Sequence, residues 1–73
     1  MGKEELLGEQ GIVVEPLQAG IEGMIRIHGE LWRAISTEPL QPGNTVKVVR
    51  IDGLKLHVQP LQAAEAAVVT AGI

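Results

Sequence analysis

The stretch from 43 to 60, GNTVKVVRIDGLKLHVQP, is the feature that most constrains the fold of this chain. In its second half Leu54, Leu56 and Val58 alternate with polar residues, and this period of two is typical of a half-buried strand. Asp52-Gly53 separates that half from the preceding apolar run. Asp-Gly favours a type I′ hairpin turn, because both central residues of that turn need a positive φ. The stretch therefore predicts two antiparallel strands, at about 45–51 and 54–60.

The composition restricts what the interior can contain. The chain has 73 residues with no Phe, no Tyr and a single aromatic, Trp32. A domain of this size buries only roughly 60% of its unfolded surface. Its core must therefore be aliphatic, and short runs of Val and Ile favour a sheet.

Three further strands are expected upstream, at about 11–18, 24–28 and 31–37. Ile25 and Ile27 share one face of the second strand. In the third strand we expect Trp32 and Ala34 to point inward, because the indole is the one large ring available to fill the interior. Five short strands with frequent turn residues indicate a sandwich or a barrel, and closure hides the strand edges. The predicted fold class is all-β, a small five-stranded antiparallel barrel.

The two ends of the chain differ in composition from the predicted barrel at 11–60. Residues 1–10 carry four charged residues, with glycines that stop a helix early, and we expect an approach or linker segment. Residues 61–73 are Ala-rich with one charge, and we expect a disordered tail, because short isolated helices are marginal in water.

The chain resembles the C-terminal soluble domain of NfeD proteins over about residues 6–61. The resemblance lies in LLGEQGIVVEPL, in GMIRIHGELWRAIS with its GExW piece at 29–32, and in LQPGNTVKVVRIDGLKLHVQPL with its VxVVxxDGLxLxVxP piece at 46–60. Two departures are the loop at 18–22 and His28, a position that is commonly acidic in the family. The resemblance implies a barrel of the oligonucleotide/oligosaccharide-binding (OB) type, attached to a membrane-embedded segment absent from this chain. It also implies a partner, the stomatin- or prohibitin-like (SPFH-type) membrane scaffold encoded beside such proteins; some long members carry a serine protease domain.

The residues themselves indicate no catalytic, cofactor or metal site. The absence of Cys excludes thiolate ligands, and His28 and His57 fall on predicted outward faces without helical spacing. Ser36 lies in a strand pattern, with no sharp turn or helix N-terminus beside it to activate a nucleophile. We therefore expect a protein that is not an enzyme and holds no cofactor.

Nucleic acid is disfavoured as a partner by charge. The net charge is −3, and the basic residues are interleaved with acidic ones. A barrel of this type binds single strands by stacking bases on several aromatic rings, whereas this chain has one. Binding of single-stranded nucleic acid is therefore less favoured, and we keep it as the alternative function.

Membrane contact is expected only through segments absent from this chain. No apolar run approaches the ~20 residues that span a bilayer, and MGKEELLGEQ is not a signal peptide. The expected location is a soluble, cytoplasmic domain of a membrane-associated protein, which the absence of Cys fits.

Apolar residues occur on both faces of the strands at 31–37 and 45–51, although a small barrel has one interior. The surplus predicts an exposed apolar surface, which is typical of a partner site; the alternative is that the termini cover it. Trp32 is either core filler or a partner anchor. The expected function is a non-catalytic interaction domain that binds the scaffold or its own copies in a homo-oligomer. The candidate partner surface comprises Met24, Trp32, Ile35, Val49 and Ile51.

Overall fold

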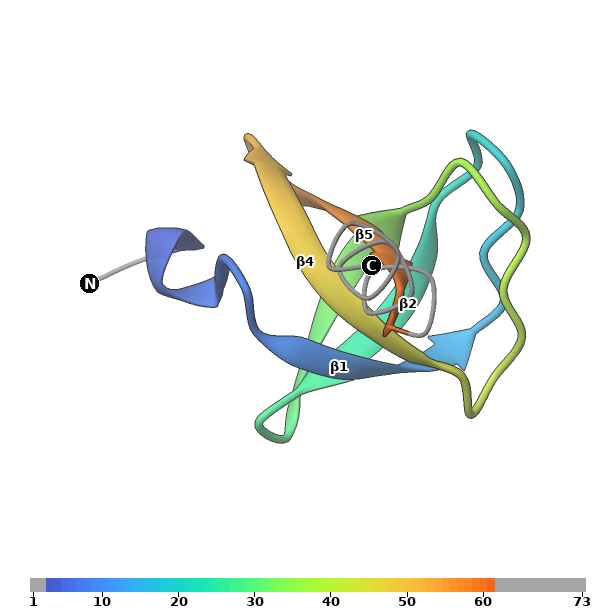
Figure 1. Ribbon diagram of the computed structural model, residues 1–73, viewed down its shortest axis with the longest axis horizontal. Helices are drawn as coiled ribbons and strands as arrows, with labels where there is room; N and C mark the ends of the chain where they lie inside the picture. Colours follow the sequence, from blue (N-terminus) through green and yellow to red (C-terminus); the bar gives the residue numbers. More distant parts are fainter. Residues whose placement is uncertain (1–2, 62–73) are drawn as a thin grey trace, which may run out of the picture.

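The computed structural model describes residues 3–61, which form a five-stranded closed barrel with a short helical turn at its start (Figure 1). The strand order around the barrel is β1-β2-β3-β5-β4, and β4 pairs with β1 to close it. The elements are a 3-10 turn, η1 (Lys3–Leu6), followed by β1 (Gln10–Glu15), β2 (Gly23–Ile27), β3 (Glu30–Ile35), β4 (Thr45–Asp52) and β5 (Lys55–Pro60). The predicted all-β class and barrel are confirmed.

One strand pair corrects the antiparallel prediction. β3 and β5 run parallel, with Ala34 opposite Leu56 and Ile35 opposite His57, while the other four pairs are antiparallel. The reason is one of parity. Strand direction alternates around an all-antiparallel cylinder, so a closed barrel with an odd number of strands must contain a parallel pair.

Two strand ends also differ from the prediction by more than one residue. β1 ends at Glu15 and not at 18, since Pro16 has no N–H for the ladder. β3 ends at Ile35 and not at 37; Ser36 instead bridges to Ala19 in the long loop before β2. The predicted tail at 61–73 lies, apart from Leu61, outside the described residues.

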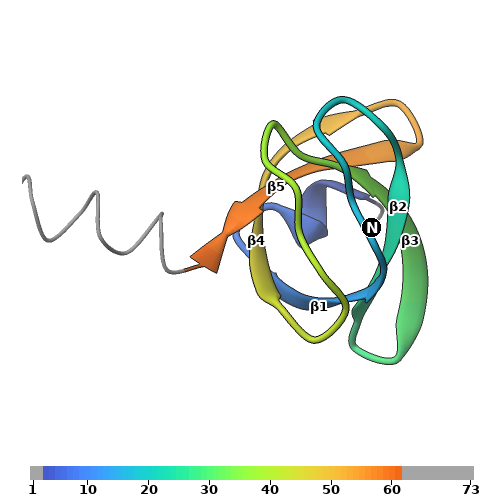
Figure 2. The ribbon, with the colours of Figure 1, turned by 90° about the vertical axis from the view of Figure 1, so that its right-hand side faces the viewer.

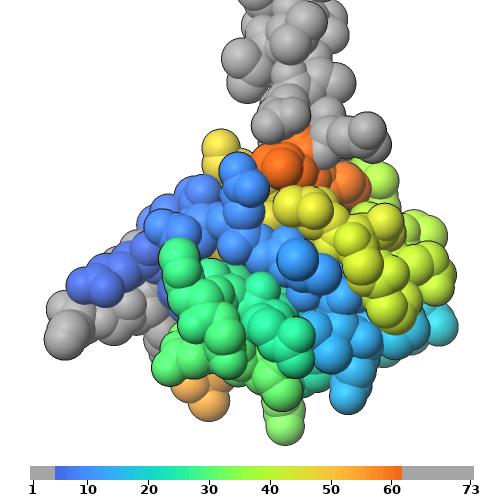
Figure 3. All heavy atoms as spheres, turned by 90° about the horizontal axis from the view of Figure 1, so that it is seen from below, coloured from blue at the N-terminus to red at the C-terminus, as the bar shows by residue number. Residues whose placement is uncertain are grey.

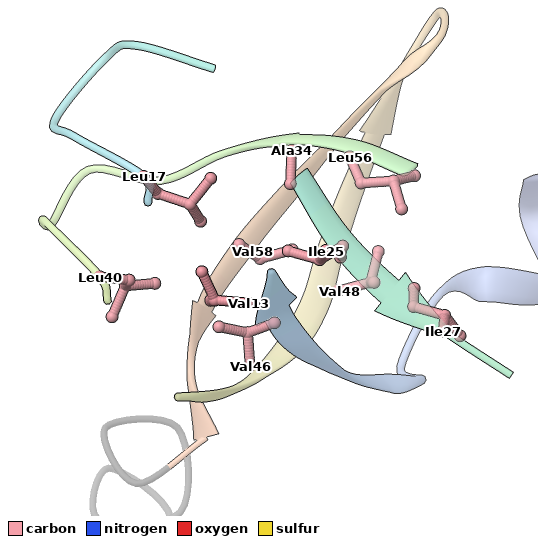
Figure 4. Packing of buried hydrophobic residues seen from close by; sticks show 10 residues of the cluster. All are labelled: Val13, Leu17, Ile25, Ile27, Ala34, Leu40, Val46, Val48, Leu56 and Val58. Atoms are coloured by element: carbon pink, nitrogen blue, oxygen red, sulfur yellow. The ribbon is translucent and has the colours of Figure 1, made fainter. Parts of the chain in front are cut away.

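The core is one aliphatic cluster inside the barrel (Figure 4). Ala34 is buried and Trp32 packs half-buried against the cluster, so the predicted inward face of β3 is confirmed. The cluster comprises Val13, Leu17, Ile25, Ile27, Ala34, Leu40, Val46, Val48, Leu56 and Val58.

The two ends of the barrel are closed by different segments (Figures 1 and 2). At one end η1 lies across the opening, and Leu6 packs against the core. The chain after η1 joins β4 through Gly8 N–H to Val48 O, 2.9 Å, so the predicted approach segment is partly sheet. At the other end Leu17 and Leu40 exchange two backbone hydrogen bonds and bury both side chains.

The hairpin turns correct one detail. Between β4 and β5 the two-residue loop is Gly53-Leu54, not Asp52-Gly53, because Asp52 pairs with Lys55. Gly53 has φ 63° and Leu54 does not have a positive φ, which is the type II′ pattern. The β2–β3 loop is the one with two positive φ values, 52° at His28 and 82° at Gly29, as in a type I′ turn.

Candidate functional site

A shallow hollow of about 440 Å³ lies on the outside of the barrel over β5, and we call it the β5 groove. It opens where β3 and β5 part, since their register covers only two residue pairs. β3, β4, β5 and the loop before β2 all contribute to it. Its lining comprises Gly20, Ile35, Ser36, Thr37, Val49, Arg50, His57, Val58 and Gln59.

A β-bulge in β4 builds one wall of the groove. Val48 is opposite Val58 and Arg50 is opposite His57, so Val49 is an extra residue without a partner. Val49 and Arg50 are consequently both exposed, although neighbours in a regular strand point to opposite faces. The bulge therefore places an aliphatic side chain and a guanidinium over the same residue of β5.

The polar contacts of the groove join Arg50, His57 and Asp52. Arg50 Nη2 donates to His57 Nε2 at 3.3 Å, which uses the lone pair of that ring nitrogen. Asp52 Oδ2 lies 4.0 Å from Arg50 Nη2 and 3.7 Å from His57 Nε2. Arg50 and Asp52 are about two-thirds exposed, whereas His57 is half-buried. The Arg50–Asp52 pair therefore contributes little to stability and remains open to other ions.

The structure brings together two of the five predicted surface residues. Ile35 on β3 and Val49 on β4 both line the groove, on either side of β5. Ile51 and Trp32 instead pack half-buried against the core, and Met24 lies half-buried on β2, outside the lining. The bulge explains Ile51, because the extra residue shifts the inward face of β4 from even to odd positions.

Arg50 and His57 were missed as groove residues. Alternation alone would turn Arg50 inward with Val46 and Val48, and the run VVR carries no sequence mark of the bulge that prevents this.

The indole of Trp32 is unsuited to base stacking in the groove. It is on the inward face of β3 beside the core, and its Nε1 is buried without a hydrogen-bond partner among the residues the structure describes.

Ser36 is held in a structural role. Its side chain is 5% exposed, and its Oγ accepts a hydrogen bond from Glu38 N at 3.0 Å. Within residues 3–61 no hydrogen bond joins Ser36 to a basic side chain, and no group of three His, Cys, Asp or Glu could hold a metal. His28 Nε2 instead contacts Glu9 Oε1 at 2.9 Å, on the surface.

A second hollow, of about 490 Å³, lies on the outside of the barrel over β1, a strand that is not a neighbour of β5 in the barrel. Figure 3 shows this face, with β1 in blue between the green β2–β3 hairpin and the yellow start of β4. Ile12, 52% exposed, lies opposite Arg26 on β2 and Thr45 on β4, and all three line the hollow.

Known proteins share this architecture. The C-terminal domain of a stomatin operon partner protein from Pyrococcus horikoshii superposes with a TM-score of 0.74 at 47% identity, over 82% of this chain and 94% of that one. The soluble domain of the NfeD protein YuaF from Bacillus subtilis gives 0.72 at 28% identity, over 78% and 75%.

A curated relative is much longer than this chain. A membrane-bound protease from Pyrococcus horikoshii is 49% identical over 59 residues, which are 78% of this chain and 13% of that protein. Among residues 3–61 we find no helix with the length and hydropathy that a membrane crossing requires. A family model described as the NfeD-like C-terminal, partner-binding domain matches residues 3–60. The chain therefore belongs to the NfeD family and corresponds to its C-terminal domain.

Proposed function

We propose that this domain is a non-catalytic docking module, which binds a stomatin-like membrane scaffold through the outer face of β3, β5 and β4. The observation that carries the proposal is the β5 groove, where Ile35 and Val49 expose aliphatic surface beside Arg50. Exposed apolar patches rimmed by polar residues are typical of partner sites. The family description and the relative named a stomatin operon partner support a protein as the ligand.

The domain is proposed to reach the membrane through segments outside this chain, on the cytoplasmic side. A solved structure from Corynebacterium glutamicum, 28% identical and described as the soluble domain of a membrane protein, supports an anchor elsewhere in the full-length protein. The cytoplasmic side is consistent with the absence of Cys. Labelling of a single introduced Cys on the full-length protein in intact cells tests it, and modification by an impermeant reagent would refute it.

The partner experiment uses the soluble part of the neighbouring scaffold protein and the 15N-labelled domain. We expect amide shifts to concentrate on Ile35, Val49, Arg50 and His57. Ile12→Asp, a change in the β1 hollow, is the matched control and should bind like the unmodified domain. Scaffold addition that perturbs no amide of β3 to β5 would refute the proposal.

Absence of catalysis is tested on the same mixture. The name of the protease relative concerns a protein of which this chain spans 13%. Ser36 is buried and hydrogen-bonded to Glu38 N, which supports a role in the loop and not in hydrolysis. We expect the scaffold to stay intact over long incubation, and cleavage that Ser36→Ala abolishes would contradict this.

Direct measurements distinguish the scaffold from two other possible ligands, a second copy of the domain and single-stranded DNA. Self-association would appear as a concentration-dependent mass in sedimentation, and the scaffold proposal expects a monomer at micromolar concentration. Single-stranded DNA binding would quench Trp32 emission in a salt-dependent way. We expect no quenching, because the ring packs on the core and the net charge is −3.

A further inference from the structure

The β5 groove differs in charge from the chain as a whole. The chain has nine Asp and Glu against six Lys and Arg, yet none of the nine lining residues is acidic and one of them, Arg50, is a cation. Lys47, opposite Gln59 of the lining, adds a second cationic side chain on the outer side of β4. The groove is therefore a locally cationic site on an acidic domain.

Asp52 only partly neutralises this site. Its contact with Arg50 is 4.0 Å long, the outer limit of an ion pair, and both side chains are about two-thirds exposed. A guanidinium has five N–H donors, and one donor of Arg50 is directed at His57. Donors consequently remain for a second carboxylate.

The apolar part of the groove suits one or two side chains. Ile35 on β3 and Val49 on β4 lie on either side of β5, whose Val58 lines the groove although its side chain belongs to the core. A volume of about 440 Å³ is within the range of sites that take small ligands, and is too small for the face of a folded domain. The opening follows the line where β3 and β5 diverge, which favours an extended chain over a helix.

From these features we infer that the β5 groove binds an extended acidic segment of a protein partner. One aliphatic side chain of the segment packs between Ile35 and Val49, and a neighbouring carboxylate accepts hydrogen bonds from Arg50. The inference rests on the proposed function and specifies the chemistry of the segment bound. A nucleic-acid strand is the less suited anion, because the described residues that line the groove include no Phe, Tyr or Trp for base stacking.

The experiment titrates the 15N-labelled domain with three probes: a short peptide in which Glu alternates with Leu and Val, the same peptide with Lys in place of Glu, and oligo-dT. We expect the Glu peptide to shift the amides of Ile35, Val49, Arg50 and His57, with an affinity that falls as salt rises. The Lys peptide should leave them unmoved. Arg50→Glu should weaken Glu-peptide binding at least about tenfold, the factor for one charge-assisted hydrogen bond.

The matched control is Arg26→Glu, which makes the same charge change in the β1 hollow. It should bind the Glu peptide with nearly unchanged affinity. Arg50→Lys keeps the charge and should retain most of the binding. Dispersed amide spectra and an unchanged urea midpoint verify that each variant is folded.

Several outcomes would overturn the inference. The first is that the Glu peptide at millimolar concentration causes no saturable amide shift, and the second is that the Lys peptide binds as tightly as the Glu peptide. The inference would also fail if amide shifts were confined to the β1 hollow, or if only oligo-dT shifted the amides of the groove. Scaffold binding that survives Arg50→Glu and the competing Glu peptide would overturn the inference while leaving the proposed function intact. Groove binding of the Glu peptide without any scaffold binding would support the groove chemistry and refute the stomatin-like partner.

Discussion

Gly23→Ala is the substitution whose effect the structure constrains most tightly. Gly23 is buried at the start of β2, where the chain after β1 crosses over it. An added Cβ would collide with Pro16 O, and would lie 2.5 Å from Leu17 Cδ2 and 2.8 Å from Glu15 O. Two of these three atoms belong to the backbone, so rotation of a side chain cannot relieve the contact.

The magnitude follows from what must move. Overpacking of a tight site costs about 1–3 kcal/mol. Relief requires displacement of residues 15–17, which strains the two Leu17–Leu40 backbone hydrogen bonds, 2.9 and 2.8 Å long, at about 1 kcal/mol more. We therefore expect a loss of about 3 kcal/mol in the free energy of unfolding. In a domain of this size that lowers Tm by about 12–24 °C.

The assay is equilibrium urea unfolding followed by Trp32 emission, with thermal circular dichroism as a second probe. Gly20→Ala is the control. Its Cβ meets nothing within 4 Å, but Gly20 has φ 76°, so that variant should lose only about 1 kcal/mol. A Gly23→Ala loss no larger than that of Gly20→Ala would refute the steric reasoning.

Four further substitutions test other parts of the fold by urea midpoints. His28→Gly should raise the free energy of unfolding by about 0.5–1 kcal/mol, because φ 52° strains a side chain while the exposed contact with Glu9 is worth little; a lower midpoint would contradict this. Gly53→Ala should cost about 1 kcal/mol, since the II′ turn needs its positive φ, and a neutral result would argue against the Gly53-Leu54 loop. Ile51→Asp should cost roughly 2 kcal/mol or more and Val49→Asp under about 0.5 kcal/mol, because the bulge turns Ile51 toward the core and Val49 to solvent; the reverse order would disprove the bulge.

The strands were predictable because their side chains alternate. Ile25 and Ile27, like Leu56 and Val58, occupy every second position and are buried as that period requires. The inward direction of Trp32 was also predictable, since an interior without Phe or Tyr has few ways to fill its volume.

The residues of the candidate surface differ in environment for an equally local reason. Ile35 and Val49 line the β5 groove, whereas Ile51 packs against the core, because a bulge of one residue reverses every later side chain in β4. That bulge is stabilised by pairing with β5 and with the segment before β1, through the bond from Gly8 N–H to Val48 O. Gly8 is remote from the VVR run in the sequence, although β5 follows it closely.

The sequence by itself determined the aliphatic core, the five strands and the segments in which the turns fall, because these depend on side-chain volume, on period and on residues that accept positive φ. The tertiary structure alone decided the parallel pairing of β3 with β5, which follows from closing an odd number of strands. It also decided the β5 groove, since Ile35, Arg50 and His57 meet only where two strands that are not consecutive in the chain lie side by side. Contacts of that kind depend on closure of the barrel, and local sequence patterns do not predict them.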